Sequence, residues 1–283
     1  MPEFLVPNSG FGGEEVSALA ARAGVSVPPE AVVAAVSADG IRACGFSVSR
    51  ARAWSVWRRL HAEHADGSGW YPVLSLVDPV TLVGGCPGVT TVAGREAVAE
   101  AVARDPDQVI AEVVAAFRVD CFDKSPDVET EQEWLQELTP RLVAPSLAGP
   151  IDAPVPGDPW KGFLAWHEDL WMCLVEARQG YEIPVLLQGL PHTPNWWVET
   201  VRRGLEPADH LCFLRSWQRR FGAELFYIDG SNVRLTVSRP PLTPSAAAQA
   251  AVERFAYSSD GAPDITELAD GEMRSTVWSC WWD

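Results

Sequence analysis

The chain has 283 residues, of which 47% are hydrophobic and 21% are charged, so it can form one large domain or two ordinary ones. Its 22 basic and 38 acidic residues give a formal net charge of −16, which argues against a protein that binds nucleic-acid phosphates or anionic membranes. The unusual feature of the composition is the presence of 13 tryptophans.

The first half of the sequence alternates helical and strand-like patterns. Apolar runs bounded by turn residues predict strands at 41–48 and 70–77, whereas the apolar run at 31–36 fits a helix or a strand. Apolar residues at helical spacing predict helices at 14–23, 49–65, 94–104, 107–117 and 129–142. Pro140 interrupts the last of these helices, because proline has no backbone N–H to donate.

A proline-rich stretch separates the two halves of the sequence. Residues 144–160 hold five prolines and few large apolar side chains, which indicates a linker or an extended strap on the surface. We therefore expect an N-terminal α/β region at 1–143 and a C-terminal α+β domain at 161–283.

The second half begins with an apolar run at 183–187 that predicts a strand. Further predicted elements are a helix at 206–221, a hairpin at 224–237, a helix at 243–254 and an aromatic strand at 276–282. Gly222 follows the first helix, and Thr243 is the expected N-cap of the second. The order predicts an α+β fold with a mixed or antiparallel sheet, flanking helices and a Trp-rich C-terminal strand.

Four short motifs occur in order toward the C-terminus: DHLCFLRSW at 209–217, RFGAEL at 220–225, RPPLT at 239–243 and WWD at 281–283. As a set they resemble an uncharacterised bacterial family common in actinomycetes, domain of unknown function 4253. The resemblance covers 183–283 and, more weakly, 54–74. Family members often carry Phe-Cys-Pro-Asp where this chain has YSSD at 257–260, and the stretch that follows is shorter here. The resemblance implies an α+β domain that ends on a Trp-rich strand, without an assigned chemistry.

The sequence predicts a cytoplasmic protein. The first residues have neither a cationic region nor a long apolar stretch, as a secretory signal would, and the apolar runs are too short to span a bilayer. Six cysteines occur singly without a CxxC pair, so we expect reduced thiols in the core and no zinc site.

Two clusters contain histidine. Trp166, His167, Glu168 and Trp171 lie in a segment that we interpret as helical, where the histidine and the acids could bind a metal or transfer protons. The alternative is an amphipathic helix that buries Trp166 and Leu170 and leaves the acids in solvent.

The second histidine cluster is His61 and His64, which lie three residues apart in the predicted helix 49–65. This spacing permits a metal pair, but the sequence lacks HExxH, and a capping role near the helix end is the preferred interpretation. We predict no bound metal and no cofactor.

A proline-containing loop is the favoured binding site. Residues 189–197 offer His192, Asn195, Trp196 and Trp197, and the adjacent basic pair is Arg202 and Arg203. Aromatic side chains on a rigid loop beside arginine are typical of binding hot spots. The alternative is that the two indoles fill the core beneath the loop.

The terminal tryptophans follow the alternation of a strand. Trp278 and Trp282 are expected on one face and Trp281 on the other, so an uncovered face would be an interaction surface.

No nucleophile elbow and no phosphate-binding loop is present in the sequence. We therefore predict a non-catalytic binding module with an acidic, Trp-lined surface, suited to neutralising a basic protein such as a toxin. The alternative is an enzyme or small-ligand-binding protein with a pocket between the two halves, using His167 and Glu168, or His192 with Arg202 and Arg203. We expect no nucleic-acid or membrane partner, and either a monomer or a homodimer.

Overall fold

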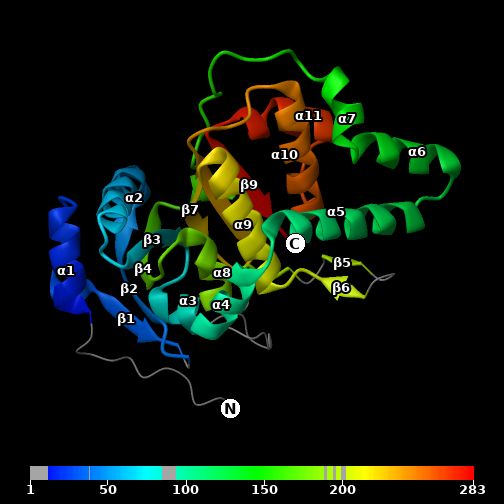
Figure 1. Cartoon of the computed structure of the whole chain (residues 1–283). Helices are drawn as coiled ribbons and strands as arrows, with labels where there is room; N and C mark the ends of the chain where they lie inside the picture. The colour runs from blue at the N-terminus through cyan, green and yellow to red at the C-terminus, as the bar shows by residue number, and fades with distance from the viewer. Residues whose placement is uncertain (1–11, 38, 85–93, 188–189, 194–195, 199–201) are drawn as a thin grey trace. The chain divides into compact units, whose positions relative to one another are not determined.

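The computed structural model describes residues 12–37, 39–84, 94–187, 190–193, 196–198 and 202–283 (Figure 1). In this part of the chain, helices accompany a mixed seven-stranded sheet with the order β1-β2-β4-β3-β7-β8-β9, and a separate pair is formed by β5 and β6. The α+β fold and the Trp-rich final strand confirm the predicted fold class.

The strands are β1 (Val33–Val36), β2 (Arg42–Ser49), β3 (Trp70–Ser75), β4 (Asp169–Glu176), β5 (Trp197–Val198), β6 (Arg203–Gly204), β7 (Ala223–Ile228), β8 (Asn232–Val237) and β9 (Val277–Trp281). The helices are α1 (Gly13–Arg22), α2 (Arg50–Ala65), α3 (Pro79–Gly84), α4 (Arg95–Ala103), α5 (Pro106–Asp123), α6 (Val128–Glu137), α7 (Pro140–Val143), α8 (Ile183–Leu186), α9 (Pro207–Phe221), α10 (Pro244–Tyr257) and α11 (Ile265–Asp270). Short 3-10 turns occur at Pro29–Ala31, Ala144–Ser146, Gly162–Trp166, Gly180–Glu182 and Glu272–Arg274.

The chain forms two compact units, each assembled from three segments. The first comprises 1–103, 159–192 and 225–230, and the second comprises 104–158, 193–224 and 231–283. The proline-rich segment ends where the chain passes from the second unit to the first. The acidic residues are concentrated in the second unit, which has 23 acidic and 13 basic side chains.

The first unit is built on antiparallel strands. β2 pairs with β1 and β4, β3 pairs with β4, and β3 meets β7 in parallel at Leu74 and Tyr227. Helix α2 packs on β3, where the Trp57 indole N–H donates to the Pro72 carbonyl at 2.9 Å. Trp57 also stacks on Trp54, with 5.4 Å between the ring centroids. Some of the 13 tryptophans therefore serve to pack the first unit.

The second unit is a helical layer with the antiparallel strands β8 and β9. Helix α5 packs against α9 and α10, and α10 packs against α11, as the green, yellow and orange-to-red helices of Figure 1 show. Its core is aromatic: Trp217 and Trp278 are fully buried with ring centroids 5.6 Å apart. In the β8–β9 register, Trp278 lies opposite Leu235.

The proline-rich segment is an extended strap within the second unit. Fully buried Arg274 donates from its two terminal nitrogens to the carbonyls of Ala148 and Gly149, both at 2.8 Å. Further along, Val155 forms a parallel bridge with Ser275. Beyond the 3-10 turn at Ala144–Ser146, the strap therefore satisfies backbone and guanidinium groups next to β9.

Most predicted elements are confirmed, and the prediction at 183–187 is wrong. That run forms the short helix α8 and not a strand. A brief run of apolar residues is buried equally well as helix or strand, so periodicity does not distinguish the two. Pro184 in the first turn fits the helix, because the missing N–H has no intrahelical partner there. The acidic helix 129–142 is two helices, with Pro140 starting the second.

Replacing Thr243 by alanine should lower the free energy of unfolding of the second unit by about 1 kcal/mol. The Thr243 hydroxyl oxygen accepts from the Ala246 N–H at 3.4 Å and caps α10. Urea unfolding of the variant, compared with Thr243→Ser as a cap-preserving control, measures the effect. Equal losses in the two variants would contradict a capping role.

Candidate functional site

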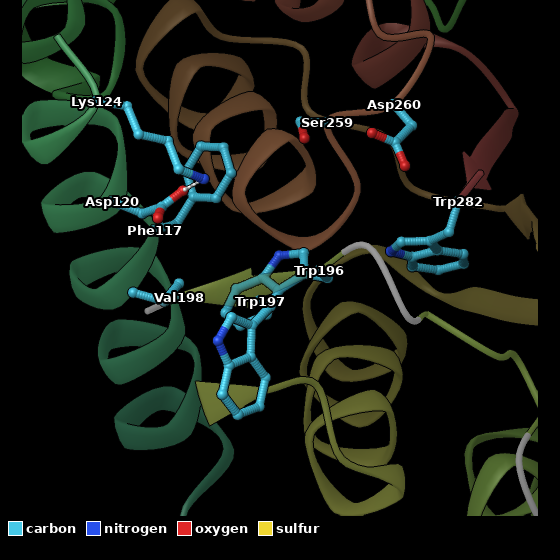
Figure 2. A pocket seen from close by; sticks show the side chains of 9 residues that line it. All are labelled: Phe117, Asp120, Lys124, Trp196, Trp197, Val198, Ser259, Asp260 and Trp282. Carbon is cyan, nitrogen blue, oxygen red and sulfur yellow. Dashed lines mark hydrogen bonds and ion pairs between the residues drawn. The ribbon is translucent and has the colours of Figure 1, made fainter. Parts of the chain in front are cut away.

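A pocket of about 140 Å³ opens on the second unit (Figure 2). It is about as large as cavities that hold a benzene ring and smaller than typical sites for drug-sized ligands. The pocket therefore has room for one side chain or a group of similar size. Its lining residues are Phe117, Asp120, Lys124, Trp196, Trp197, Val198, Ser259, Asp260 and Trp282.

Helix α5 provides the first wall of the pocket. The helix begins where the Asp105 side chain accepts from the Asp107 N–H at 3.0 Å, with proline in the first turn. Phe117, Asp120 and Lys124 follow at spacings of three and four residues, so they lie along one face of the helix.

The β5 segment provides the floor and one rim. Trp196 is 6% exposed, and its indole N–H donates to the Ala256 carbonyl at 2.7 Å. Trp197 lies opposite Gly204 in the register of β5 and β6, and it is 46% exposed. A Cβ at Gly204 would lie 3.5 Å from the Trp197 ring, which is an ordinary van der Waals distance.

The third wall follows the ends of α10 and β9. The Trp282 indole N–H donates to the Tyr257 carbonyl at 3.0 Å, and the Asp283 N–H donates to the Asp260 carboxylate at 3.0 Å. The buried Ser258 hydroxyl donates to the Trp281 carbonyl at 2.6 Å and accepts from the Trp281 N–H at 2.9 Å. These bonds fix the segment that carries Asp260 against the end of β9.

The pocket has aromatic walls and an acidic character. Asp120 accepts from the Lys124 ammonium at 2.7 Å, and the side chains of the two residues are 14% and 68% exposed. The segment 105–137, which includes this wall, has ten acidic and two basic residues. A cation near the pocket mouth is therefore attracted by the local field as well as by the aromatic faces.

Of the predicted loop residues, Trp196 and Trp197 line the pocket, whereas Asn195 lies outside the described residues. Arg203 forms an ion pair with the fully buried Asp209 at 2.6 Å. Arg202 is exposed and has a φ of 49° in the turn before β6. The structure thus brings the two indoles together and directs Arg203 into an internal ion pair.

The other predicted site residues lie in the first unit. His192 is half-buried, and its backbone N–H donates to the Gly230 carbonyl at 2.6 Å. His167 and Glu168 are exposed between the Gly162–Trp166 turn and β4, and Trp171 is half-buried within β4.

The helix predicted at Trp166–Trp171 is wrong. Strand β4 begins at Asp169, so Trp171 belongs to the strand, His167 precedes it, and no helix carries the two residues. Leu170 is buried as expected, but Trp166 is 86% exposed and not inward-facing. Strand β4 is largely buried on both faces, so its sequence does not alternate between apolar and polar residues.

The two histidines of α2 have contacts within the first unit. His61 stacks on Trp57 at 4.8 Å, and the His64 Nε2 lies 3.0 Å from the Arg178 carbonyl. Within the described residues there is no group of three or more His, Cys, Asp or Glu side chains that could hold a metal ion.

The described cysteines are buried thiols: Cys44, Cys121, Cys173, Cys212 and Cys280. Burial raises the pKa of Cys121 and of Cys280 to about 12. These thiols are protonated at neutral pH and are poor nucleophiles. Cys86 lies outside the described residues.

Sequence reasoning missed the α5 wall and the acid at position 260. Asp120 and Lys124 are an i,i+4 pair on a helix, which looks the same in sequence as any solvated pair. Asp260 belongs to the YSSD segment at 257–260 that differs from the family pattern. The alternation of β9 is confirmed, since Trp278 and Trp282 are buried and Trp281 is 40% exposed.

Residues 171–283 match a family described as a domain of unknown function (DUF4253). No curated protein and no solved structure matches the chain. The matched region contains β5, α9, α10 and β9, and therefore two of the three pocket walls. Among the described residues, no helix has the length and apolar character needed to cross a membrane.

Proposed function

We propose that the chain is a non-catalytic binding module that engages a basic protein partner, such as a toxin, through the acidic, Trp-lined face of its second unit. The observation that carries this proposal is the pocket in which Trp196, Trp197 and Trp282 meet Asp120 and Asp260. Aromatic side chains in a small pocket are typical centres of protein interfaces. The alternative of an enzyme or small-ligand-binding protein stays a prediction of the sequence.

The distribution of charge supports a basic partner. The segment 105–137, which borders the pocket, has a net charge of −8. A surface of this charge accelerates the encounter with a positively charged protein, and salt weakens the acceleration. Trp197 is the exposed rim residue that a partner would cover.

The Trp197→Ala variant should weaken the complex at least tenfold, mainly through faster dissociation. Its matched control is Trp166→Ala, which removes an 86% exposed indole from the first unit. The partner is captured on the immobilised full chain from a lysate of the source organism. It is then purified, and its association and dissociation rates are measured by surface plasmon resonance at several salt concentrations.

Two results would contradict the proposal. One is an equal loss of affinity in the two tryptophan variants, which would place the contact elsewhere. The other is an association rate that does not change with salt, or capture of acidic partners only, because either would remove the electrostatic basis.

A further inference from the structure

We infer that the pocket of the second unit binds a guanidinium group, and that the arginine side chain of a partner is its occupant. The inference rests on the proposed function and names the chemical group that the pocket recognises. It starts from the volume of about 140 Å³, which admits a single side chain.

The pocket offers acceptors in more than one direction. In Figure 2 the carboxylates of Asp120 and Asp260 lie on either side of the Trp196 indole, and Ser259 lies beside Asp260. An ionised carboxylate has about four lone-pair positions, and that of Asp260 accepts from the Asp283 N–H at one of them. Donors that diverge from one planar group match this arrangement.

Guanidinium meets these requirements better than other biological cations. It is planar, it has five N–H donors in a fixed fork, and it stacks on aromatic faces. A quaternary ammonium has no donors and would form no hydrogen bond with either carboxylate. A lysine ammonium is a compact point charge with a strongly bound hydration shell.

The chain already places a cation of its own at this site. Lys124 is one of only two lysines in the chain, and its ammonium lies 2.7 Å from Asp120 in the pocket wall. Figure 2 shows its side chain folding back toward that carboxylate, with the ion pair drawn as a dashed line. Lys124 is thus an internal competitor that neutralises Asp120 until a partner cation displaces it.

The inference makes Lys124→Met a gain-of-binding variant. Removal of the ammonium makes the pocket more negative by one charge and exposes the Asp120 carboxylate to the ligand. We expect about twofold tighter binding of a guanidinium ligand, a size in keeping with an exposed i,i+4 ion pair. The matched control is Lys161→Met, which removes the only other lysine and should not alter binding.

The ligand test uses the full chain and small probes of defined chemistry. N-acetylarginine amide is titrated against the ¹⁵N-labelled protein, and the indole N–H signals of Trp196, Trp197 and Trp282 are followed. N-acetylcitrulline amide, which has the same shape without the charge, should bind at least about tenfold more weakly. N-acetyllysine amide and tetramethylammonium should also bind more weakly than the arginine probe.

A second variant tests the acceptors. Asp260→Asn should weaken the arginine probe about fivefold, because one charge-assisted hydrogen bond becomes neutral. Asp152→Asn, in an exposed part of the strap, should leave binding unchanged. Circular dichroism confirms that each variant is folded.

The outcomes separate this inference from the proposed function. Equal binding of arginine and citrulline probes, or weaker binding in Lys124→Met, would overturn the guanidinium inference. The same holds if the arginine probe shifts indole signals outside the pocket only. In each case a partner complex that is still sensitive to Trp197→Ala would leave the proposed function intact. A complex insensitive to Trp197→Ala would count against the proposed function, whatever the probes show.

Discussion

Replacement of Glu253 by alanine is expected to lower the free energy of unfolding of the second unit by about 3–5 kcal/mol. The Glu253 side chain is 4% exposed and accepts from the Trp217 indole at 3.0 Å and from Arg220 Nη1 at 2.9 Å. Gln249 donates a further bond at 2.8 Å. The substitution leaves the buried indole N–H unsatisfied and the Arg220 charge uncompensated, which is more costly than the loss of one hydrogen bond.

Urea unfolding measures this loss of stability. Hydrogen exchange of the α9 and α10 amides, measured separately, assigns the loss to the second unit. Glu267→Ala removes an exposed glutamate from α11 and should change the stability by less than about 0.5 kcal/mol. The double variant Glu253→Leu/Arg220→Leu removes both charges and should recover part of the stability. If Glu253→Ala unfolds like Glu267→Ala, the buried network does not stabilise the unit.

The sequence predicts the elements of the second unit well, because their end signals are local. Thr243 occupies the N-cap of α10, and Gly222 ends α9 with a φ of 61° that glycine adopts without strain. Such signals depend on a few neighbouring residues. Sequence patterns do not assign the region at 166–187 correctly, because its apolar runs are short and buried, and tertiary packing decides between helix and strand there.

The sequence alone identifies only part of the candidate site. The pair Trp196 and Trp197 stands out, since two consecutive indoles in a proline-containing loop are uncommon. Their neighbours come from α5, more than 70 residues earlier, and from the segment at 259–282. No local pattern predicts that Asp120 and Asp260 meet in one pocket, because only long-range packing brings them together.

Acidification should destabilise the second unit through a single buried histidine, His210. Burial lowers the pKa of His210 from 6.5 to about 3, and its Nδ1 lies 2.6 Å from the Tyr257 hydroxyl. The ring also contacts Trp282 at 5.7 Å between centroids. The carboxylate of the neighbouring Asp209 forms an ion pair with Arg203. Among the described contacts, none joins an acidic side chain to the His210 ring.

The sign of the effect follows from the lowered pKa. The unfolded chain binds a proton below a pH of about 6.5, whereas the folded unit resists protonation until the pH is near 3. The stabilisation by neutral His210 is therefore complete above pH 6.5 and is lost as the pH falls toward 3. The loss between about pH 7 and about pH 4 amounts to about 3 kcal/mol.

His210→Gln isolates this contribution, because glutamine can hydrogen-bond to the Tyr257 hydroxyl and does not titrate in this range. The free energy of unfolding is measured from about pH 7 to about pH 4, with hydrogen exchange of α9 and α10 as the readout. The difference between wild type and His210→Gln should change by about 3 kcal/mol over this range, in favour of the variant at low pH. His167→Gln, at an exposed position, should follow the wild-type profile. Parallel pH profiles for wild type and His210→Gln would mean that the ring takes up its proton in the folded unit, contrary to its burial between Tyr257 and Trp282.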